Sequence, residues 1–218
     1  MFTGIVETVG TIRALENTPE GALIKIETPT DFKVIELGES IAVNGTCLTA
    51  ILILDRGFSA NLSSETLKKT SLSEIKISTL VNLERSLTPL TKMSGHFVLG
   101  HVDEVGTIVE IKKEEGQTLF RFKHSENMVL YIVEKGSIAI DGISLTVFDC
   151  RDNCFSVSVI PFTLIHTNLF ERKMGDKVNL ECDMIGKYVV KACENFLGGK
   201  PSGNSSITPE FLKRYGYE

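Results

Sequence analysis

The chain has 218 residues, of which 42% are hydrophobic and 23% are charged, and its formal net charge is −5 at pH 7. This apolar content suffices for one large core or for two cores of about 100 residues each. The negative charge argues against a surface that attracts a phosphate backbone, so we expect no nucleic-acid partner.

The expected compartment follows from other features of the same sequence. Its first residues do not form a charged segment followed by an apolar one, and we find no run of about 18 apolar residues. The five cysteines are an odd number without the spacing of a disulfide-rich scaffold, which favours reduced thiols. We therefore expect a cytoplasmic protein with no membrane partner.

Short runs of alternating apolar and polar residues predict strands along most of the chain. Residues 24–27, 75–78 and 120–123 each place apolar side chains at every second position. Turn residues separate such runs at intervals of about ten residues, which is typical of a small closed barrel or a sandwich.

A helical pattern begins near Gly186. Apolar residues then recur at helical spacing up to a Gly-Gly pair that predicts the helix end; they are Val189, Cys193, Phe196 and Leu197, before Gly198-Gly199. Such a stripe packs either on the chain's own barrel or on another subunit, and the pattern does not decide between them.

Residues 40–49, SIAVNGTCLT, return at an offset of 97 as residues 137–146, SIAIDGISLT. The segment VNLE occurs at 81–84 and again at 178–181, and VGTI at 9–12 matches 105–108 at an offset of 96. A duplication of this kind predicts two homologous domains. We place them at residues 1–96 and 97–195, followed by the helix end and a tail at 196–218.

The repeated segment contains a predicted turn and a predicted strand. Asn44-Gly45 and Asp141-Gly142 are typical tight-turn dipeptides. In a strand that leaves such a turn, Cys47 and Thr49 share one face and Leu48 takes the other. A ligand at that face would meet a thiol, a hydroxyl and backbone amides. The alternative is a duplicated hairpin whose polar residues only cap their own turn.

Two of the four histidines, His96 and His101, lie in the segment SGHFVLGHVD at the boundary between the copies. Histidine titrates near neutrality, so both are candidates for acid–base or binding roles, although structural histidines would look the same.

Cys150 and Cys154 flank a turn-like stretch, but a second pair of metal ligands is missing nearby, so we expect no metal site.

Several of these motifs together resemble the riboflavin synthase family, alpha-chain type. They are MFTGIVE, VNGTCLT, DGISLTV, GHFVLGHVD and the two VNLE segments, in family order over residues 1–195. The resemblance implies an all-β fold: two homologous six-stranded Greek-key closed barrels in tandem plus a C-terminal α-helix. It also implies a homotrimer formed through that helix, and leaves open an enclosing shell of lumazine synthase.

The activity implied is a transferase reaction, the last step of riboflavin biosynthesis. Two molecules of 6,7-dimethyl-8-ribityllumazine exchange a four-carbon unit and yield riboflavin and 5-amino-6-(D-ribitylamino)uracil, without a metal or an organic cofactor. In the family each barrel binds one lumazine, and the reacting pair meets between the N-terminal barrel of one subunit and the C-terminal barrel of another.

The resemblance also implies substrate-binding residues. For the first barrel they are Gly4, Ile5, Val6, Cys47, Leu48, Thr49, Asn61, Leu62, Ser63, Ser64, Glu65, Thr66, Gly100, His101 and Val102. For the second barrel they are Ser144, Leu145, Thr146, Ser158, Val159, Ile160, Pro161, Phe162 and Thr163, with Lys135 from a neighbouring subunit. Phe2 is expected to stack on a ring.

Three of these residues, Cys47, His101 and Ser144, are also catalytic candidates, together with Ser40 and Asp183. Cys47 is either a nucleophile or polar contact, or a packing residue, because a free cysteine behaves as a small hydrophobe. Asp183 is either an active-site acid or a charge at a helix start. The group that removes the methyl proton stays undecided, since water and a ribityl hydroxyl are also candidates.

A non-catalytic relative offers a rival interpretation. The lumazine protein family has the same double barrel and holds a chromophore as an optical antenna. Its members look degraded around the positions of Cys47, His96 and His101, all of which this chain retains, so catalysis is favoured.

Overall fold

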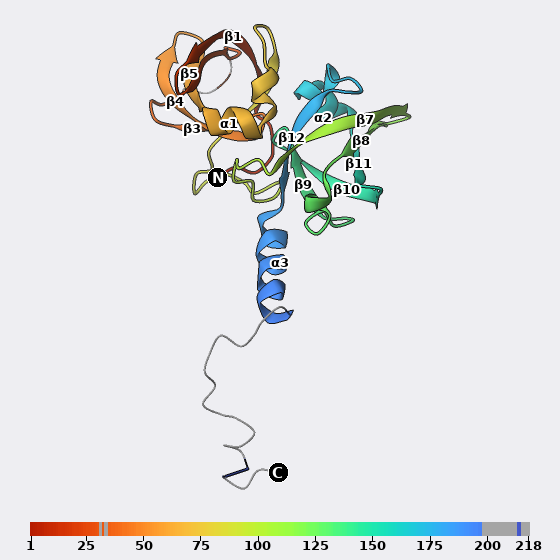
Figure 1. Ribbon diagram of the computed structural model, residues 1–218. Coiled ribbons are helices and arrows are strands. Elements are labelled where there is room, and N and C mark those ends of the chain that lie inside the picture. The colour runs from red at the N-terminus through yellow and green to blue at the C-terminus, as the bar shows by residue number, and fades with distance from the viewer. Residues whose placement is uncertain (31, 33–34, 198–212, 215–218) are drawn as a thin grey trace.

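The computed structural model describes residues 1–30, 32, 35–197 and 213–214. Two closed antiparallel barrels lie side by side, and one helix projects away from them (Figure 1). The predicted all-β architecture with a C-terminal helix is confirmed. No helix in the described part of the chain is long and apolar enough to span a membrane.

The first barrel contains six strands in the order β1-β2-β5-β4-β3-β6, with β1 closing onto β6. The neighbours β6-β3-β4-β5 form a Greek key. A short helix and a 3₁₀ helix follow β5. The elements are β1 (Thr8–Thr18), β2 (Gly21–Glu27), β3 (Ser40–Val43), β4 (Thr46–Leu54), β5 (Gly57–Ser63), α1 (Ser64–Lys69), the 3₁₀ helix Ser71–Glu74 and β6 (Leu80–Arg85).

The second barrel repeats this arrangement in the order β10-β11-β8-β7-β12-β9. Its elements are β7 (Glu104–Glu114), β8 (Gln117–Lys123), the 3₁₀ helix Glu126–Met128, β9 (Ser137–Ile140), β10 (Ile143–Arg151), β11 (Cys154–Val159), α2 (Pro161–Ile165), the 3₁₀ helix Asn168–Phe170 and β12 (Lys177–Cys182). The predicted boundary at residues 96 and 97 falls in the linker between β6 and β7.

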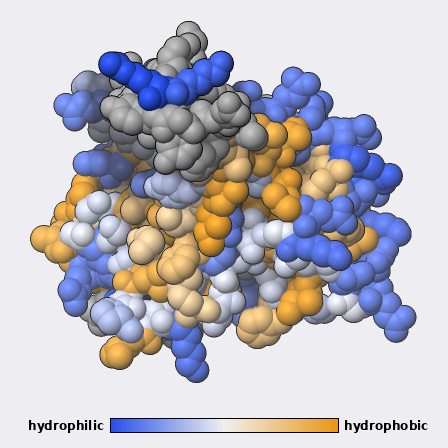
Figure 2. Space-filling view, turned by 90° about the horizontal axis from the view of Figure 1, so that it is seen from below, coloured by the Kyte–Doolittle hydropathy of each residue, from blue (hydrophilic) through white to orange (hydrophobic). Residues whose placement is uncertain are grey.

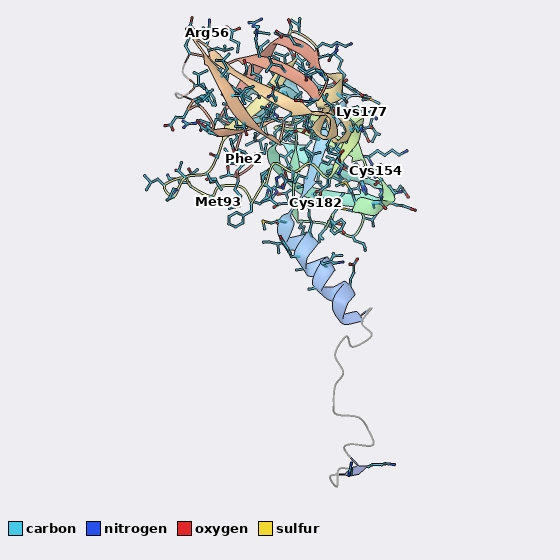
Figure 3. All side chains as sticks on the ribbon, turned by 60° about the vertical axis from the view of Figure 1, so that its left-hand side comes forward. Phe2, Arg56, Met93, Cys154, Lys177 and Cys182 are labelled. Carbon is cyan, nitrogen blue, oxygen red and sulfur yellow. The ribbon has the colours of Figure 1, made fainter. Side chains whose placement is uncertain are left out.

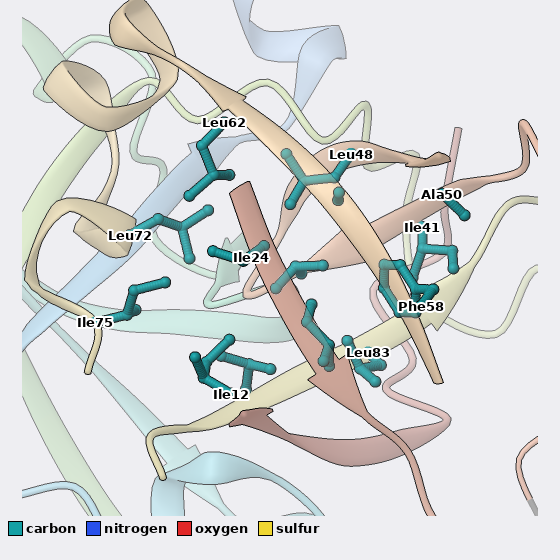
Figure 4. Packing of buried hydrophobic residues seen from close by; sticks show 14 of the residues in the cluster. Ile12, Ile24, Ile41, Leu48, Ala50, Phe58, Leu62, Leu72, Ile75 and Leu83 are labelled. Atoms are coloured by element: carbon teal, nitrogen blue, oxygen red, sulfur yellow. The ribbon is translucent and has the colours of Figure 1, made fainter. Parts of the chain in front are cut away.

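Each barrel has its own apolar core, built from the inward residues of its strands. Figure 4 shows the core of the first barrel. Ile24 and Ile26 on β2 are fully buried, as are Phe120 and Phe122 on β8, so the alternation predicted for these runs is confirmed. The strand predicted at 75–78 is wrong. Ile75 packs on the core from a loop, whereas Ile77 is 64% exposed in a turn.

The two repeated turns face each other at the junction between the barrels. Asn44 and Asp141 have φ values of 45° and 45°, and the glycine after each also has a positive φ. A Cβ atom on Gly45 would lie 2.6 Å from the nitrogen of Gly142, and one on Gly142 would lie 2.8 Å from the nitrogen of Gly45. Only glycine permits this approach, so both copies of the turn are required by the packing of the barrels.

A buried network of amide and carboxylate groups surrounds these turns. Asn82 donates from its side chain to the Asp141 carbonyl at 2.9 Å and accepts from the Asn168 backbone N–H at 2.6 Å. Its equivalent in the second copy, Asn179, donates to the Asn44 carbonyl at 2.7 Å. The asparagine of each VNLE segment therefore binds the turn of the opposite barrel.

Helix α3 (Met184–Leu197) begins and ends close to the predicted limits. It points away from both barrels (Figure 1), and Ile185, Tyr188 and Val189 are 61%, 68% and 55% exposed. The alternative in which this helix packs on its own barrel is therefore wrong. The face from which it projects carries several apolar patches (Figure 2).

Replacing Asn82 by alanine should lower the free energy of unfolding by about 2–4 kcal/mol, because the buried Asp141 carbonyl and Asn168 N–H lose their partner. Urea unfolding measures the change. Asn17→Ala at the exposed end of β1 is the control and should stay within about 0.5 kcal/mol of the parent. Equal unfolding midpoints for both variants would contradict a stabilising network.

Candidate active site

The outer face of β3 and β4 presents the predicted thiol and hydroxyls together. Ser40 pairs with Thr49 in the strand register, and Ala42 pairs with Cys47. Leu48 is 4% exposed and points into the core, while Thr49 is exposed and Cys47 is half-buried. The predicted division of faces is confirmed, and Cys47 and Thr49 lie on one outer surface with Ser40.

The second barrel repeats this surface on β9 and β10. Ser137 pairs with Thr146, and Ala139 pairs with Ser144. Thr146 is exposed and Ser144 is half-buried, as are their counterparts in the first barrel. A hydroxyl at Ser144 thus occupies the place of the Cys47 thiol.

Beyond these residues the neighbouring strands separate. The register of β4 with β5 begins at Ala50 paired with Ala60, and that of β10 with β11 at Val147 paired with Val157. The strand edge at Cys47 is completed instead by residues from outside its barrel.

We call residues 2–5 and 98–101 the crossing segments. They pair with each other through Phe2 and Val98, whose N–H groups donate to the opposite carbonyls at 2.7 and 3.1 Å. Each then contacts the outer surface of one barrel. The Cys47 N–H donates to the Gly100 carbonyl at 2.9 Å, and the Ser144 N–H donates to the Gly4 carbonyl at 2.7 Å.

This geometry corrects one predicted assignment. Gly4, Ile5 and Val6 were expected at the first barrel, but Gly4 is bonded to Ser144 of the second, and Val6 packs against the second core. The sequence order misleads here because the N-terminal segment crosses the junction. Gly100 lies against Cys47 of the first barrel, where the resemblance placed it.

Two buried carboxylates hold the crossing segments. Glu84 accepts from the Thr3 N–H and hydroxyl, both at 2.6 Å, and from the Gly4 N–H at 3.0 Å. Glu181 accepts from the N–H groups of three consecutive residues at 2.6, 3.0 and 3.0 Å; they are Leu99, Gly100 and His101. Burial raises the pKa of Glu84 above its ordinary value and that of Glu181 to about 7, against the opposing effect of these donors.

The histidines make the two surfaces chemically different. His96 Nδ1 lies 2.7 Å from the Ser144 hydroxyl, and its Nε2 is buried without a protein partner. Burial lowers the pKa of His96, and the Asp183 carboxylate partly offsets this. A neutral imidazole beside Ser144 can exchange a proton with its hydroxyl. At the first surface His101 is exposed next to Gly100.

Asp183 has a structural role in addition to its charge. Its carboxylate accepts from the Ile185 N–H at 2.9 Å at the start of α3, as the helix-start alternative predicts. Its effect on the pKa of His96 also places its charge near the second surface. The two interpretations of Asp183 are therefore compatible.

Other predicted binding residues lie where β5 and β11 end. Asn61, Ser63, Ser158 and Phe162 are exposed, and Ser63 caps α1 by accepting from the Thr66 N–H at 3.0 Å. Three predicted contacts have side chains in the barrel cores instead; they are Leu48, Leu62 and Val159, with exposures of 4%, 1% and 0%. Lys135 is exposed in a turn with φ 67°.

Phe2 occupies a different position from the one expected. It is 0% exposed and packs with Ala42, Val98 and Ala139 between the barrels (Figure 3). Stacking of this ring on a ligand is contradicted by that burial. The side chain is a core residue of the junction, because both crossing segments meet on it.

Sequence reasoning did not identify the two glutamates that hold the crossing segments. The signal was present, because the two VNLE segments repeat a glutamate directly after an apolar leucine at equivalent places, and a charge that is buried there is costly without partners. Within the described ranges, no group of three His, Cys, Asp or Glu side chains is arranged to hold a metal ion.

Comparisons with known proteins agree with the internal duplication. A family model described as lumazine binding domain matches residues 3–86 and 99–183. Over its whole length the chain is 45% identical to a riboflavin synthase of Actinobacillus pleuropneumoniae, with 100% of each chain covered. It is 43% identical to one of Schizosaccharomyces pombe, covering 89% of this chain and 94% of that protein.

Solved structures of LumP have the same fold. The structure complexed with riboflavin has a TM-score of 0.78 at 24% identity, and the structure complexed with flavin mononucleotide has a TM-score of 0.75 at 26% identity. Each comparison covers 84% of this chain and 99% of LumP.

The raised pKa of Glu181 predicts a pH-dependent stability. The folded state binds this proton more strongly than the unfolded chain, so the contribution is fully present below pH 4.5 and is lost as the pH rises through about 7. The loss amounts to about 3 kcal/mol. Glu181→Gln should remove this pH dependence in urea unfolding, whereas Glu110→Gln, a control for the charge, should keep it. If the free energy of unfolding changes with pH in the same way for the parent and both variants, Glu181 is not the source of the pH dependence.

Proposed function

The chain belongs to the riboflavin synthase family, and we propose that it converts two molecules of 6,7-dimethyl-8-ribityllumazine into riboflavin and 5-amino-6-(D-ribitylamino)uracil. The observation that carries this proposal is the pair of equivalent outer surfaces, one on each barrel. A reaction between two identical molecules needs two similar binding sites, and the duplication supplies them. The full-length identity of 45% to a riboflavin synthase supports the same conclusion.

We assign one lumazine to each surface. The first site comprises Cys47, Thr49, the end of β5 with α1, and residues 100–102. The second comprises Ser144, Thr146, the end of β11 with α2, and residues 4–6. Backbone amides and hydroxyls at these strand edges match the carbonyls and ring nitrogens of a flat heterocycle, and the exposed hydroxyls of Ser63 and Ser158 suit a ribityl chain.

Positioning is the main catalytic contribution in this proposal. Holding two rings face to face makes their reaction effectively intramolecular, which lowers the barrier by up to about 7–11 kcal/mol in favourable cases. The chain's side chains then move protons or add to a ring. Ser144, with His96 at 2.7 Å, is suited to proton exchange at the second site, while Cys47 and His101 act at the first.

We further propose that α3 joins three chains, so that the first site of one subunit faces the second site of another. Its exposed apolar residues, Ile185, Tyr188 and Val189, would otherwise contact water. Lys135 would then approach a site of the neighbouring chain. The cytoplasmic location stays a prediction from the sequence, and the resemblance leaves a surrounding lumazine synthase shell open.

Mixing the purified protein with the lumazine alone tests the proposal. Riboflavin absorbance should rise without added metal, with one riboflavin formed for every two lumazines consumed. Stable stoichiometric fluorescence without product would instead support the antenna function of the lumazine protein family and contradict the enzyme.

In the same assay Cys47→Ser should lower kcat by about tenfold, which corresponds to about 1.4 kcal/mol of transition-state stabilisation. The variant places a hydroxyl at both equivalent positions, since Ser144 is the counterpart of Cys47. Cys150→Ser, at an exposed cysteine of β10, is the control and should retain full turnover. Full activity in both variants would remove the thiol from the mechanism.

A chain that ends at Gly186 should sediment as a monomer, because it lacks the exposed apolar face of α3. A chain that ends at Leu197 keeps the helix and should sediment as a trimer. Analytical ultracentrifugation distinguishes the two. Trimers of the shorter chain would place the subunit contact elsewhere.

A further inference from the structure

The contacts of Glu84 and Glu181 run across the junction rather than within one barrel. Glu84 belongs to β6 of the first barrel and binds the Gly4 N–H, while the Gly4 carbonyl binds the Ser144 N–H of the second barrel. Glu181 belongs to β12 of the second barrel and binds the Gly100 N–H. The Gly100 carbonyl in turn binds the Cys47 N–H of the first barrel.

Both series of contacts are tightly packed at their glycines. A Cβ atom on Gly4 would lie 2.6 Å from the Cβ atom of Ser144, and one on Gly100 would lie 2.5 Å from that of Cys47. Both glycines also have positive φ, +77° and +81°. A shift of either glutamate therefore moves the backbone against which Cys47 or Ser144 rests.

The carboxylates are well suited to fix these positions. Glu84 is 5% exposed and Glu181 is 3% exposed, and each accepts three hydrogen bonds from one crossing segment. These donors fix the orientation of both carboxyl oxygens, and the hydrogen bonds strengthen where the glutamate is ionised, which for Glu181 means above about pH 7. The crossing segments are too short to hold this geometry through a core of their own.

We propose that Glu84 and Glu181 are positioning residues, each for the ligand site on the opposite barrel: Glu181 for the site at Cys47, and Glu84 for the site at Ser144. Each site is thus completed by the other barrel of the same chain. This inference rests on the proposed function, because it takes the two outer surfaces as lumazine sites.

Hydrogen exchange at single-residue resolution tests the crossed pattern on the full chain. Glu181→Gln should speed exchange of the Cys47 amide by about tenfold and leave the Ser144 amide within about twofold of the parent, since one charge-assisted contact is lost. Glu84→Gln should do the reverse. Each variant is the matched control of the other, and Glu→Asp at each position should show the same selectivity if a Gln variant does not fold.

Riboflavin is the ligand with which binding at the two sites is tested in the same exchange experiment. In the parent it should slow exchange at both amides. In Glu181→Gln the concentration that protects Cys47 should rise about tenfold while that for Ser144 is unchanged, with the opposite result for Glu84→Gln. A merely structural role would shift both amides, or only the amide in the glutamate's own barrel.

Two outcomes overturn the proposal and are distinguishable. Equal changes at both amides in each variant, with the parent still protected by riboflavin, would refute crossed positioning and leave the proposed function intact. Absence of riboflavin protection at both amides of the parent would refute the ligand sites themselves, and the proposed function with them.

Discussion

The close approach of Gly45 and Gly142 determines how the two barrels face each other. With a Cβ atom at either residue the backbones would collide, so the tight turns meet only because both are glycines. The carbonyl groups of Asp141 and Asn44 in these turns are then buried and need donors, which the side chains of Asn82 and Asn179 supply. The repeated NG and DG dipeptides therefore build the junction, and the strands that leave them carry the candidate sites.

The junction makes the two barrels dependent on each other. The crossing segments pair with each other through Phe2 and Val98. Each completes the strand edge of one barrel, while a carboxylate of the other barrel holds it. A buried carboxylate is costly unless it is hydrogen-bonded, and three donors each at Glu84 and Glu181 offset that cost. The duplication thus yields two barrels whose outer surfaces each depend on a carboxylate of the other barrel, rather than two independent domains.

Small differences between the copies give the sites different chemistry. A thiol at Cys47 stands where Ser144 has a hydroxyl, and only Ser144 has a histidine, His96, at hydrogen-bond distance. The linker places His101 at the first surface. The equivalent residue of the N-terminal segment, at the second surface, is Ile5. Such asymmetry within a common frame suits a reaction in which two identical molecules play different parts.

Local patterns in the sequence were sufficient to predict most strands, the C-terminal helix and the shared face of Cys47 and Thr49, because alternation and spacing within a few residues become faces of the backbone. The duplication was visible from segments 97 residues apart. The strand pattern left a barrel or a sandwich open, and only the family resemblance implied closed barrels. The tertiary structure alone decided that Phe2 is core, that Gly4 serves the second barrel, and that Glu84 and Glu181 hold the crossing segments. These outcomes depend on hydrogen bonds between residues about 80 or more positions apart, and no local pattern encodes which distant strand a segment will meet.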